Sequence, residues 1–339
     1  MNKKRKNRYN LLKAYLRGDT VLSGLPLSII LSSTSRCNLK CPMCPRAISE
    51  FANVDIDFEL FKKIVDEGKE LFEFVIPQGG GEPLLNPQLV DMVKYCKNLG
   101  IRVGFSTNAT VLTEDVSRKL IEAGLDYIIF AFDGATPEVY EYYRKGAKFD
   151  KVRKNILNFL KLKKELKSKV FVTLQMVRLP LNNGQIKDFY KLWKVDGVDE
   201  IRIKEDEIKI EGVGFKEEVE KVAKKKGKMA PCHYLWQGPV YIEENGDVYP
   251  CCHAWLSDPI GNIKEKSLAE IWNCDRIVKM REAHIKGDVS EFPECVNCAA
   301  PRPKKILIIG SFLVDTFNVR KIIPFVEKLN ILYKIKLFD

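Results

Sequence analysis

Long apolar segments are missing from this chain of 339 residues. The longest candidate, residues 306–314, has about half the length that a helix needs to cross a bilayer. A secretory signal is not expected either, because Lys13 and Arg17 interrupt the segment that would have to be apolar. Without secretion, the ten cysteines indicate a reducing environment, in which thiols bind metals and clusters rather than form disulfides. The sequence therefore predicts a cytoplasmic protein.

Acidic side chains are absent from residues 1–17, which carry seven lysines and arginines and so most of the formal net charge of +11. A basic segment of this kind can bind nucleic acid or an anionic membrane surface. A solvated, partly helical tail explains the charge more simply, because a run of like charges usually lies in solvent. We expect this segment to be dispensable for chemistry.

Histidine is scarce, with three in the chain, the first at His233. None is therefore available near Cys37, Cys41 and Cys44, which are spaced Cys-x-x-x-Cys-x-x-Cys. Zinc modules usually add nearby histidines or repeat Cys-x-x-Cys pairs. A four-iron cluster normally takes one thiolate per iron, so three thiolates leave one iron open for a ligand that is not protein. The spacing favours a catalytic [4Fe–4S] cluster over a structural zinc site.

Short apolar runs alternate with longer amphipathic stretches from residue 26 onward. Strands separated by helices predict crossover connections and a parallel sheet. Six such units fit an incomplete barrel, in which functional groups gather at the C-terminal ends of the strands. The expected strands are residues 27–33, 74–77, 102–106, 127–132, 170–177 and 200–204, and the expected helices are 58–71, 88–99, 113–123, 150–166 and 185–193.

Three further motifs follow the expected strands in order: QGGGEP at residues 78–83, FSTN at 105–108 and FAFDG at 130–134. Together with the cysteine motif they resemble the radical SAM (S-adenosylmethionine) superfamily over about residues 26–205. The resemblance implies an α/β fold, a partial (β/α)6 TIM-like barrel. It also implies that SAM chelates the open iron of the cluster at Cys37, Cys41 and Cys44, and that one electron cleaves SAM to a 5′-deoxyadenosyl radical.

The same resemblance implies SAM contacts at the strand ends. An ordinary glycine turn and a simple strand-to-helix turn are the structural alternatives for the second and third motifs. Ala131 departs from the family, because relatives often carry serine there, and this weakens the assignment of Asp133. Arg144 could bind a carboxylate bidentately or lie on a helix surface. The expected SAM-binding residues are Gly80, Gly81, Glu82, Ser106, Asn108 and Asp133.

A second group of cysteines follows residue 230 and resembles the SPASM/twitch extension of radical SAM enzymes, which holds auxiliary iron–sulfur clusters. Gly246 precedes Cys251 by five positions, as in that extension. Cys252 competes with Cys251, since adjacent residues of an extended chain point to opposite sides, and a zinc site would use the same four ligands. Cys96 and Cys274 are expected to be buried thiols. The cysteine count implies one auxiliary [4Fe–4S] cluster, held by Cys232, Cys251, Cys295 and Cys298.

These patterns divide the chain into four parts: a basic arm at residues 1–25, the barrel at 26–215, the cysteine-rich SPASM/twitch domain at 216–304 and an extension at 305–339. Lysines around Gly227 predict a linker or an exposed helix end at 216–230. The extension reads as strand, helix and strand. It is too short to form a domain of its own, so we expect it to pack against the rest.

The leading functional hypothesis is an oxidoreductase-type enzyme. It would abstract hydrogen from a small molecule such as an alcohol, sugar or polyol, while the auxiliary cluster relays an electron. The alternative is a SPASM maturase that modifies a peptide or protein. A distant alternative is a non-catalytic, metal-stabilised protein that binds RNA or a membrane, which would need no open iron. The expected partners are a small-molecule or peptide substrate and an electron donor such as ferredoxin or flavodoxin; nucleic acid is not expected.

Overall fold

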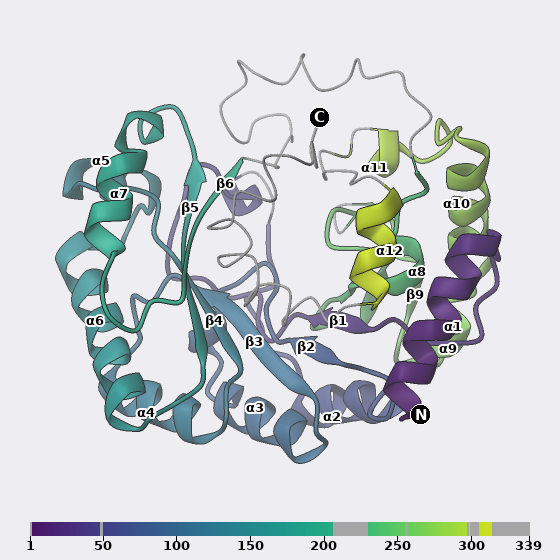
Figure 1. The fold of residues 1–339 in the computed structure, drawn as a ribbon, viewed down its shortest axis with the longest axis horizontal. Helices are drawn as coiled ribbons and strands as arrows, with labels where there is room; N and C mark the ends of the chain where they lie inside the picture. The colour runs from purple at the N-terminus through teal and green to yellow at the C-terminus, as the bar shows by residue number, and fades with distance from the viewer. Residues whose placement is uncertain are drawn as a thin grey trace.

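The computed structural model describes residues 2–47, 50–205, 230–254, 257–296, 298 and 305–313. Its centre is a curved parallel sheet whose first six strands match the six predicted ones to within about two residues (Figure 1). The sheet order follows the chain order, as right-handed crossover units require. The partial barrel is confirmed. The strands are β1 (Ser28–Leu31), β2 (Phe74–Ile76), β3 (Arg102–Thr107), β4 (Tyr127–Ala131), β5 (Phe171–Arg178) and β6 (Glu200–Glu205).

Helices α2 to α7 cover the outer face of this sheet (Figure 1). Their starts follow local chemistry: the Asp57 side chain caps the first by accepting a hydrogen bond from the Leu60 amide, and Thr113 caps the third in the same way. Five of the helices were predicted, and α5 was not. The helices are α2 (Phe58–Glu67), α3 (Leu89–Asn98), α4 (Glu114–Glu122), α5 (Pro137–Tyr143), α6 (Phe149–Glu165) and α7 (Ile186–Trp193).

The cysteine-rich region extends the same sheet. Its strand β7 (Val240–Ile242) pairs in parallel with β1, so that Ile30 lies opposite Tyr241. Strands β8 (Asp247–Tyr249) and β9 (Gly261–Asn262) then add antiparallel, which gives a nine-stranded sheet among the described residues. The region also contains α8 (Tyr234–Gln237), α9 (Leu268–Ile271), α10 (Asp275–Lys286) and α11 (Pro293–Val296).

The N-terminal segment is not a solvated tail, contrary to the prediction. It forms α1 (Lys3–Arg17), which begins where the Asn2 side chain accepts from the Lys4 amide and ends at Gly18 in the left-handed conformation. Leu11, Leu12 and Tyr15 on one face of α1 are buried. Burial of that face, rather than helix propensity alone, explains why the segment is ordered.

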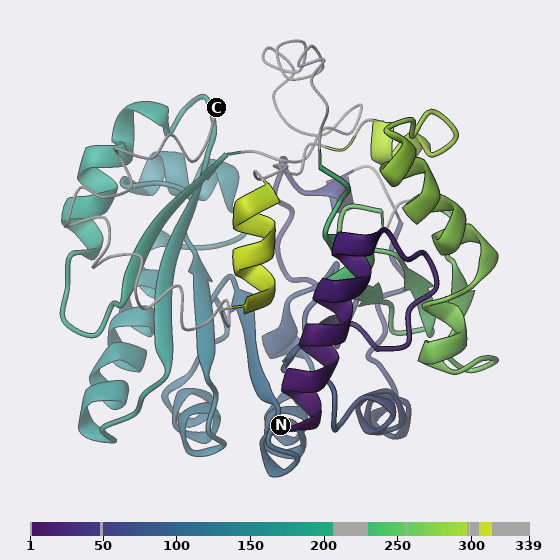
Figure 2. The same ribbon diagram turned by 45° about the vertical axis from the view of Figure 1, so that its right-hand side comes forward.

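The start of the C-terminal extension also differs from the prediction. The apolar run at 306–310, expected to be a strand, belongs to helix α12 (Lys305–Leu313). Figure 2 shows α12 beside α1, and Ile308 and Phe312 are buried there. The predicted helix and strand that follow lie outside the described residues, as do positions 216–229 of the predicted linker. In the described part of the chain, no helix is both long and apolar enough to span a membrane.

Candidate functional site

The three N-terminal cysteines lie on the loop after β1 and line a cavity of about 400 Å³ at the C-terminal ends of the strands. The glycine turn after β2 and the ends of β3 and β4 form the opposite wall. Of the predicted SAM-binding residues, Gly80, Gly81, Glu82, Ser106 and Asn108 line this cavity. Asp133 does not: it is fully buried behind the wall.

Backbone and side-chain contacts hold the cysteine loop in place. The Arg36 guanidinium binds both carboxylate oxygens of Asp55, at 3.0 and 2.6 Å, and the Lys40 amide donates to the Lys145 carbonyl at 2.9 Å. The glycine turn approaches the loop so closely that a Cβ atom on Gly81 would lie 2.4 Å from the carbonyl oxygens of Thr34 and Arg36. Only glycine fits there, so the turn and the cysteine loop lie in direct backbone contact.

Glu82 acts mainly as a brace between strand ends. Its carboxylate accepts hydrogen bonds from the Thr107 hydroxyl at 2.6 Å and from the amides of Asn108 and Leu84 at 2.7 and 3.1 Å. Burial raises the pKa of Glu82, while these three donors act in the opposite direction. The carboxylate therefore joins the β2 and β3 loops as well as facing the cavity.

Arg144, just after α5, supplies a positive charge to the cavity wall. Its guanidinium lies 2.5 Å from the carboxylate of Asp133, which also accepts a hydrogen bond from the Val177 amide at 2.7 Å. Burial opposes the charge, but Asp133 and Cys41 hold the pKa of Arg144 above its usual value. Asp133 thus holds Arg144 at the cavity, where a guanidinium can bind a carboxylate.

Cysteine ligands must lose their protons when a metal binds. Burial raises the pKa of the Cys41 thiol to about 11, and the charge of Arg144 lowers it in part. Burial likewise raises the pKa of Cys37. These thiols stay protonated near neutral pH until a cluster provides the positive charge that stabilises the thiolates.

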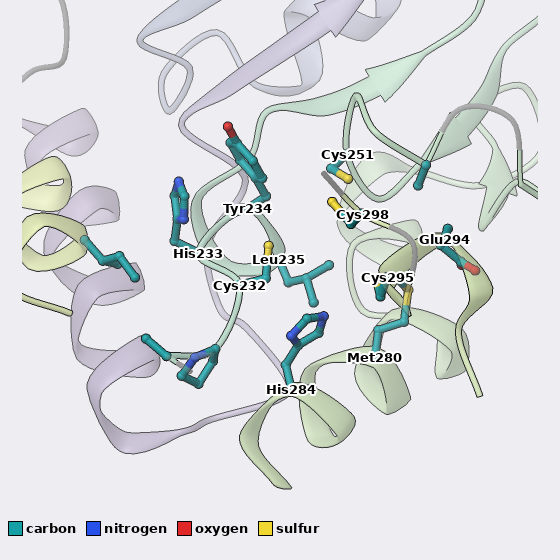
Figure 3. A pocket seen from close by; sticks show the side chains of 14 residues that line it. Cys232, His233, Tyr234, Leu235, Cys251, Met280, His284, Glu294, Cys295 and Cys298 are labelled. Atoms are coloured by element: carbon teal, nitrogen blue, oxygen red, sulfur yellow. The ribbon is translucent and has the colours of Figure 1, made fainter. Parts of the chain in front are cut away.

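The four cysteines expected to hold the auxiliary cluster come together. Cys232, Cys251, Cys295 and Cys298 line one small cavity of about 30 Å³ (Figure 3). Cys232 lies just before α8, and Cys251 lies in the turn after β8. Cys295 belongs to α11, and Cys298 follows the end of that helix by two residues. Gly246, with φ of +96°, makes the β7–β8 turn that leads to Cys251. Cys96 is fully buried and Cys274 half-buried, and neither lines this cavity.

The neighbouring residues Cys251 and Cys252 face different cavities. Cys251 lines the small cavity, whereas Cys252 lines the large one with Cys37, Cys41 and Cys44. The chain has left β8 here and bends at Cys251 and turns at Cys252, which separates the two side chains. Among the four auxiliary positions, the structure thus groups Cys251 rather than Cys252 with Cys232.

Within the described residues, no three histidine, cysteine, aspartate or glutamate side chains converge as the ligands of one ion do.

Two family models match the chain in sequence order. The model of the radical SAM superfamily covers residues 31–192, and that of SPASM, an iron–sulfur cluster-binding domain, covers residues 232–299. The chain belongs to the radical SAM superfamily and carries a SPASM domain. Membership implies a [4Fe–4S] cluster that takes SAM, together with auxiliary iron–sulfur ligation in the SPASM domain.

Similar proteins differ in what their names describe. A Pyrococcus furiosus "Tungsten-containing aldehyde ferredoxin oxidoreductase cofactor-modifying protein" is 29% identical over 321 residues, covering 80% of this chain and 86% of that protein. A PqqA peptide cyclase of Gluconobacter oxydans is 24% identical, covering 75% of this chain and 78% of the relative. Streptococcus suis SuiB bound to its precursor peptide SuiA shares the fold, with a TM-score of 0.62, 17% identity and coverage of 85% and 72%.

Sequence reasoning missed one wall of the radical SAM cavity. Tyr241 on β7 lines this cavity together with the glycine turn. Its side chain is the point at which the SPASM domain reaches that turn. A Cβ atom on Gly79 would lie 2.9 Å from the Tyr241 hydroxyl. No local signal marks this tyrosine, because its place depends on the pairing of β7 with β1.

Proposed function

We propose that this radical SAM protein uses SAM to generate a radical and modifies a peptide or a protein segment. The observation that carries the proposal is the large cavity of about 400 Å³, which must accommodate both the cluster and SAM. That volume is near the lower end of ordinary ligand sites. In this proposal the substrate presents its reacting group to the cavity from outside, as a peptide can. The similarity to a peptide cyclase and to a peptide-bound maturase fold supports this choice over alcohol or sugar oxidation.

In this proposal Cys37, Cys41 and Cys44 hold the cluster that binds SAM, and that bound pair supplies the 5′-deoxyadenosyl radical. The residues of the chain position the cofactor and keep water away. Arg144, held by Asp133, would bind the carboxylate of SAM. The Gly80–Gly81 backbone would receive its amino group, and Ser106 and Asn108 would offer polar side chains to its ribose. Met43, buried in the same wall, would pack against the adenine.

Cys232, Cys251, Cys295 and Cys298 hold one auxiliary [4Fe–4S] cluster in this proposal. Four thiolates leave no open iron, so its role is electron transfer rather than substrate binding. Tyr241 and Cys252 bring the SPASM domain to the wall of the reaction cavity. The two parts of the protein therefore contact one substrate.

The proposal is tested in anaerobically reconstituted protein by counting iron and measuring 5′-deoxyadenosine with dithionite as reductant. Candidate peptides, including those encoded beside the gene, are then incubated with the protein and examined by mass spectrometry. A SAM-dependent mass change is expected, and it should be absent in the Cys37→Ala, Cys41→Ala, Cys44→Ala variant. If 5′-deoxyadenosine never forms, the radical chemistry is refuted.

Modification of a cofactor is the second candidate, because the P. furiosus relative with that name matches most of both chains. The same assay separates the two. Stimulation of 5′-deoxyadenosine formation by a pterin or porphyrin, with no effect of any peptide, would replace the peptide proposal with this one.

A further inference from the structure

One face of α1 carries a basic stripe, here called the α1 stripe, that the proposed chemistry does not use. Its members recur at helical spacings of three and four, so they share one face of the helix. Tyr9 and Leu16 are 56% and 47% exposed, and the four cations around them are also exposed. The α1 stripe consists of Arg5, Lys6, Tyr9, Lys13, Leu16 and Arg17.

The cations of the α1 stripe differ from the other basic residues of the helix. Lys3 and Arg8 pair with Glu70 and Glu73, which tie α1 to the barrel. In the described part of the chain, no ion pair or hydrogen bond is found for the four stripe cations, and residues 1–17 contain no acid. Their charge is directed to solvent and is available to an anionic partner.

Exposed apolar side chains continue the stripe beyond the end of α1. Val21 is 66% exposed and Ile285 of α10 is 43% exposed. The two segments adjoin, since a Cβ atom on Gly18 would lie 3.4 Å from the Ile285 side chain. A surface that combines apolar side chains with charge of one sign has the composition of a protein docking site.

The inner face of the same helix packs against α8 and α12 and against the segment that leads to Cys232. The Tyr15 hydroxyl donates to the carbonyl of Pro231, the residue before Cys232, at 2.9 Å. The Tyr15 ring packs edge-on against Trp236, with centroids 5.4 Å apart, and against Phe312 of α12 at 5.7 Å. Cys232 lines the auxiliary cavity (Figure 3). One helix therefore separates the α1 stripe from the auxiliary site.

We propose that the α1 stripe is the docking surface for an acidic one-electron carrier protein of the ferredoxin or flavodoxin type. This inference rests on the proposed function, which requires an electron and an auxiliary cluster at Cys232. The carrier loses one electron and the auxiliary cluster gains it, with no bond or proton transferred. Charge complementarity selects the carrier and accelerates its association. The bond of Tyr15 to Pro231 links the basic helix to the chain at Cys232.

A membrane surface fits the described contacts less well. An interfacial helix buries a broad apolar face in the lipid boundary. The apolar face of α1, with Leu11, Leu12 and Tyr15, is already buried in the protein. On α1, Tyr9 and Leu16 are the two large apolar side chains left exposed to insert into lipid. This apolar area is small for a membrane-binding helix, so a folded protein partner fits the surface better.

The test compares two variants with the same change in net charge. The stripe variant carries Arg5→Glu, Lys6→Glu, Lys13→Glu and Arg17→Glu. The control variant carries glutamate at four exposed lysines far along the chain, whose side chains are 75–79% exposed: Lys148, Lys161, Lys164 and Lys191. Matching thermal unfolding of both variants establishes that they are folded.

Reconstituted proteins are mixed anaerobically with a reduced flavodoxin or a reduced bacterial ferredoxin, and cluster reduction is followed by stopped-flow absorbance. We expect the stripe variant to lose about tenfold or more in the bimolecular rate, together with its dependence on salt. The control variant should keep both. Reduction by dithionite, and the SAM cleavage that follows, should be unchanged in all three proteins.

Equal losses in both variants, or no loss in either, would overturn the docking site. If the wild type bound phosphatidylserine vesicles and the stripe variant did not, while both were reduced by the carrier at the same rate, the surface would be a membrane-binding site instead. Failure of the wild type to cleave SAM with dithionite would refute the proposed function. The docking site would then be tested separately, by measuring with calorimetry whether the carrier binds the wild type more tightly than the stripe variant.

Discussion

Arg144 is the side chain whose role in SAM binding rests most directly on geometry. It lines the cavity and pairs with the fully buried Asp133. Arg46, the other arginine of the described cavity wall, instead donates to the Ser35 carbonyl and to the Asn53 side chain. We expect Arg144→Gln to weaken SAM binding by about tenfold or more, since a charge-assisted hydrogen bond to a carboxylate is lost. Calorimetry with cluster-loaded protein measures the affinity. Arg178→Gln, which removes an exposed arginine paired with Glu205, is the matched control and should not alter it.

Cys251 and Cys252 offer a comparison within a single dipeptide. Cys251→Ala should remove the auxiliary cluster signal in electron paramagnetic resonance, because Cys251 lines the small cavity. Cys252→Ala should keep that signal. In the wild type, SAM should protect Cys252 from alkylation, since this thiol lines the large cavity. Loss of the auxiliary signal in the Cys252 variant alone would show that our ligand assignment is wrong.

Glu243, at the end of β7, gives the folded protein a dependence on pH. Burial raises its pKa to about 7, with Glu244 and Asp247 adding to the effect. The folded state therefore keeps this proton between about pH 4.5 and 7, where the unfolded chain has lost it, and stability falls as the pH rises through that range. Glu243→Gln cannot ionise. Its melting temperature should rise relative to wild type between pH 5 and pH 8; a constant difference would contradict the assignment.

At the scale of the elements, we expect α1 to contribute to the stability of the fold, although its basic composition predicted a solvated tail. Deleting residues 2–17 removes five buried side chains, of which Leu11, Leu12 and Tyr15 are each worth about 1.5–3 kcal/mol. It also exposes Trp236 and Phe312. We expect a clear fall in melting temperature and a lower iron content, measured by calorimetry and by iron assay. An unchanged melting temperature would restore the original expectation of a dispensable arm.

The elements also show where sequence reasoning succeeds. The six barrel strands were predicted because each is a short apolar run between amphipathic helices, and the functional motifs follow from their C-terminal ends. The apolar run of α12 was misassigned, since a short apolar run has no periodicity that separates strand from helix. Packing of Phe312 against Tyr15 accompanies the helix there. The buried positions of α1 were overlooked among its charges.

The residues of the candidate site differ in the same way: local sequence predicts some of them, and tertiary packing places the others. Cys37, Cys41 and Cys44 belong to one loop, so their spacing is sufficient to predict that they act together. Tyr241 enters the same cavity only because β7 pairs with β1, a contact between segments about 200 residues apart. Such pairing is set by tertiary packing and leaves no local pattern.

At the scale of the whole molecule, the barrel and the SPASM domain share one sheet. A fragment of residues 1–205 would lack β7 and leave an edge of β1 unpaired, and it would also lack α8 and α12, which pack against α1. Unpaired strand edges promote aggregation. We expect the fragment to be insoluble or oligomeric in size-exclusion chromatography, whereas the full chain is not. A monomeric fragment that binds a cluster would show that the domains fold independently.

The pairing of β1 with β7 also sets an order of events on the ribosome. One edge of β1 pairs with β2, but Leu31 at the other edge pairs with Ile242 of β7. That second edge has no partner strand until residue 242 has been synthesised. At about 5–20 residues per second, the nascent chain waits roughly 10–40 seconds for that strand. During this interval one edge of β1 and the buried face of α1 have no partner to cover them. Production of the protein should therefore be sensitive to chaperone supply, and slower translation should lengthen that exposure.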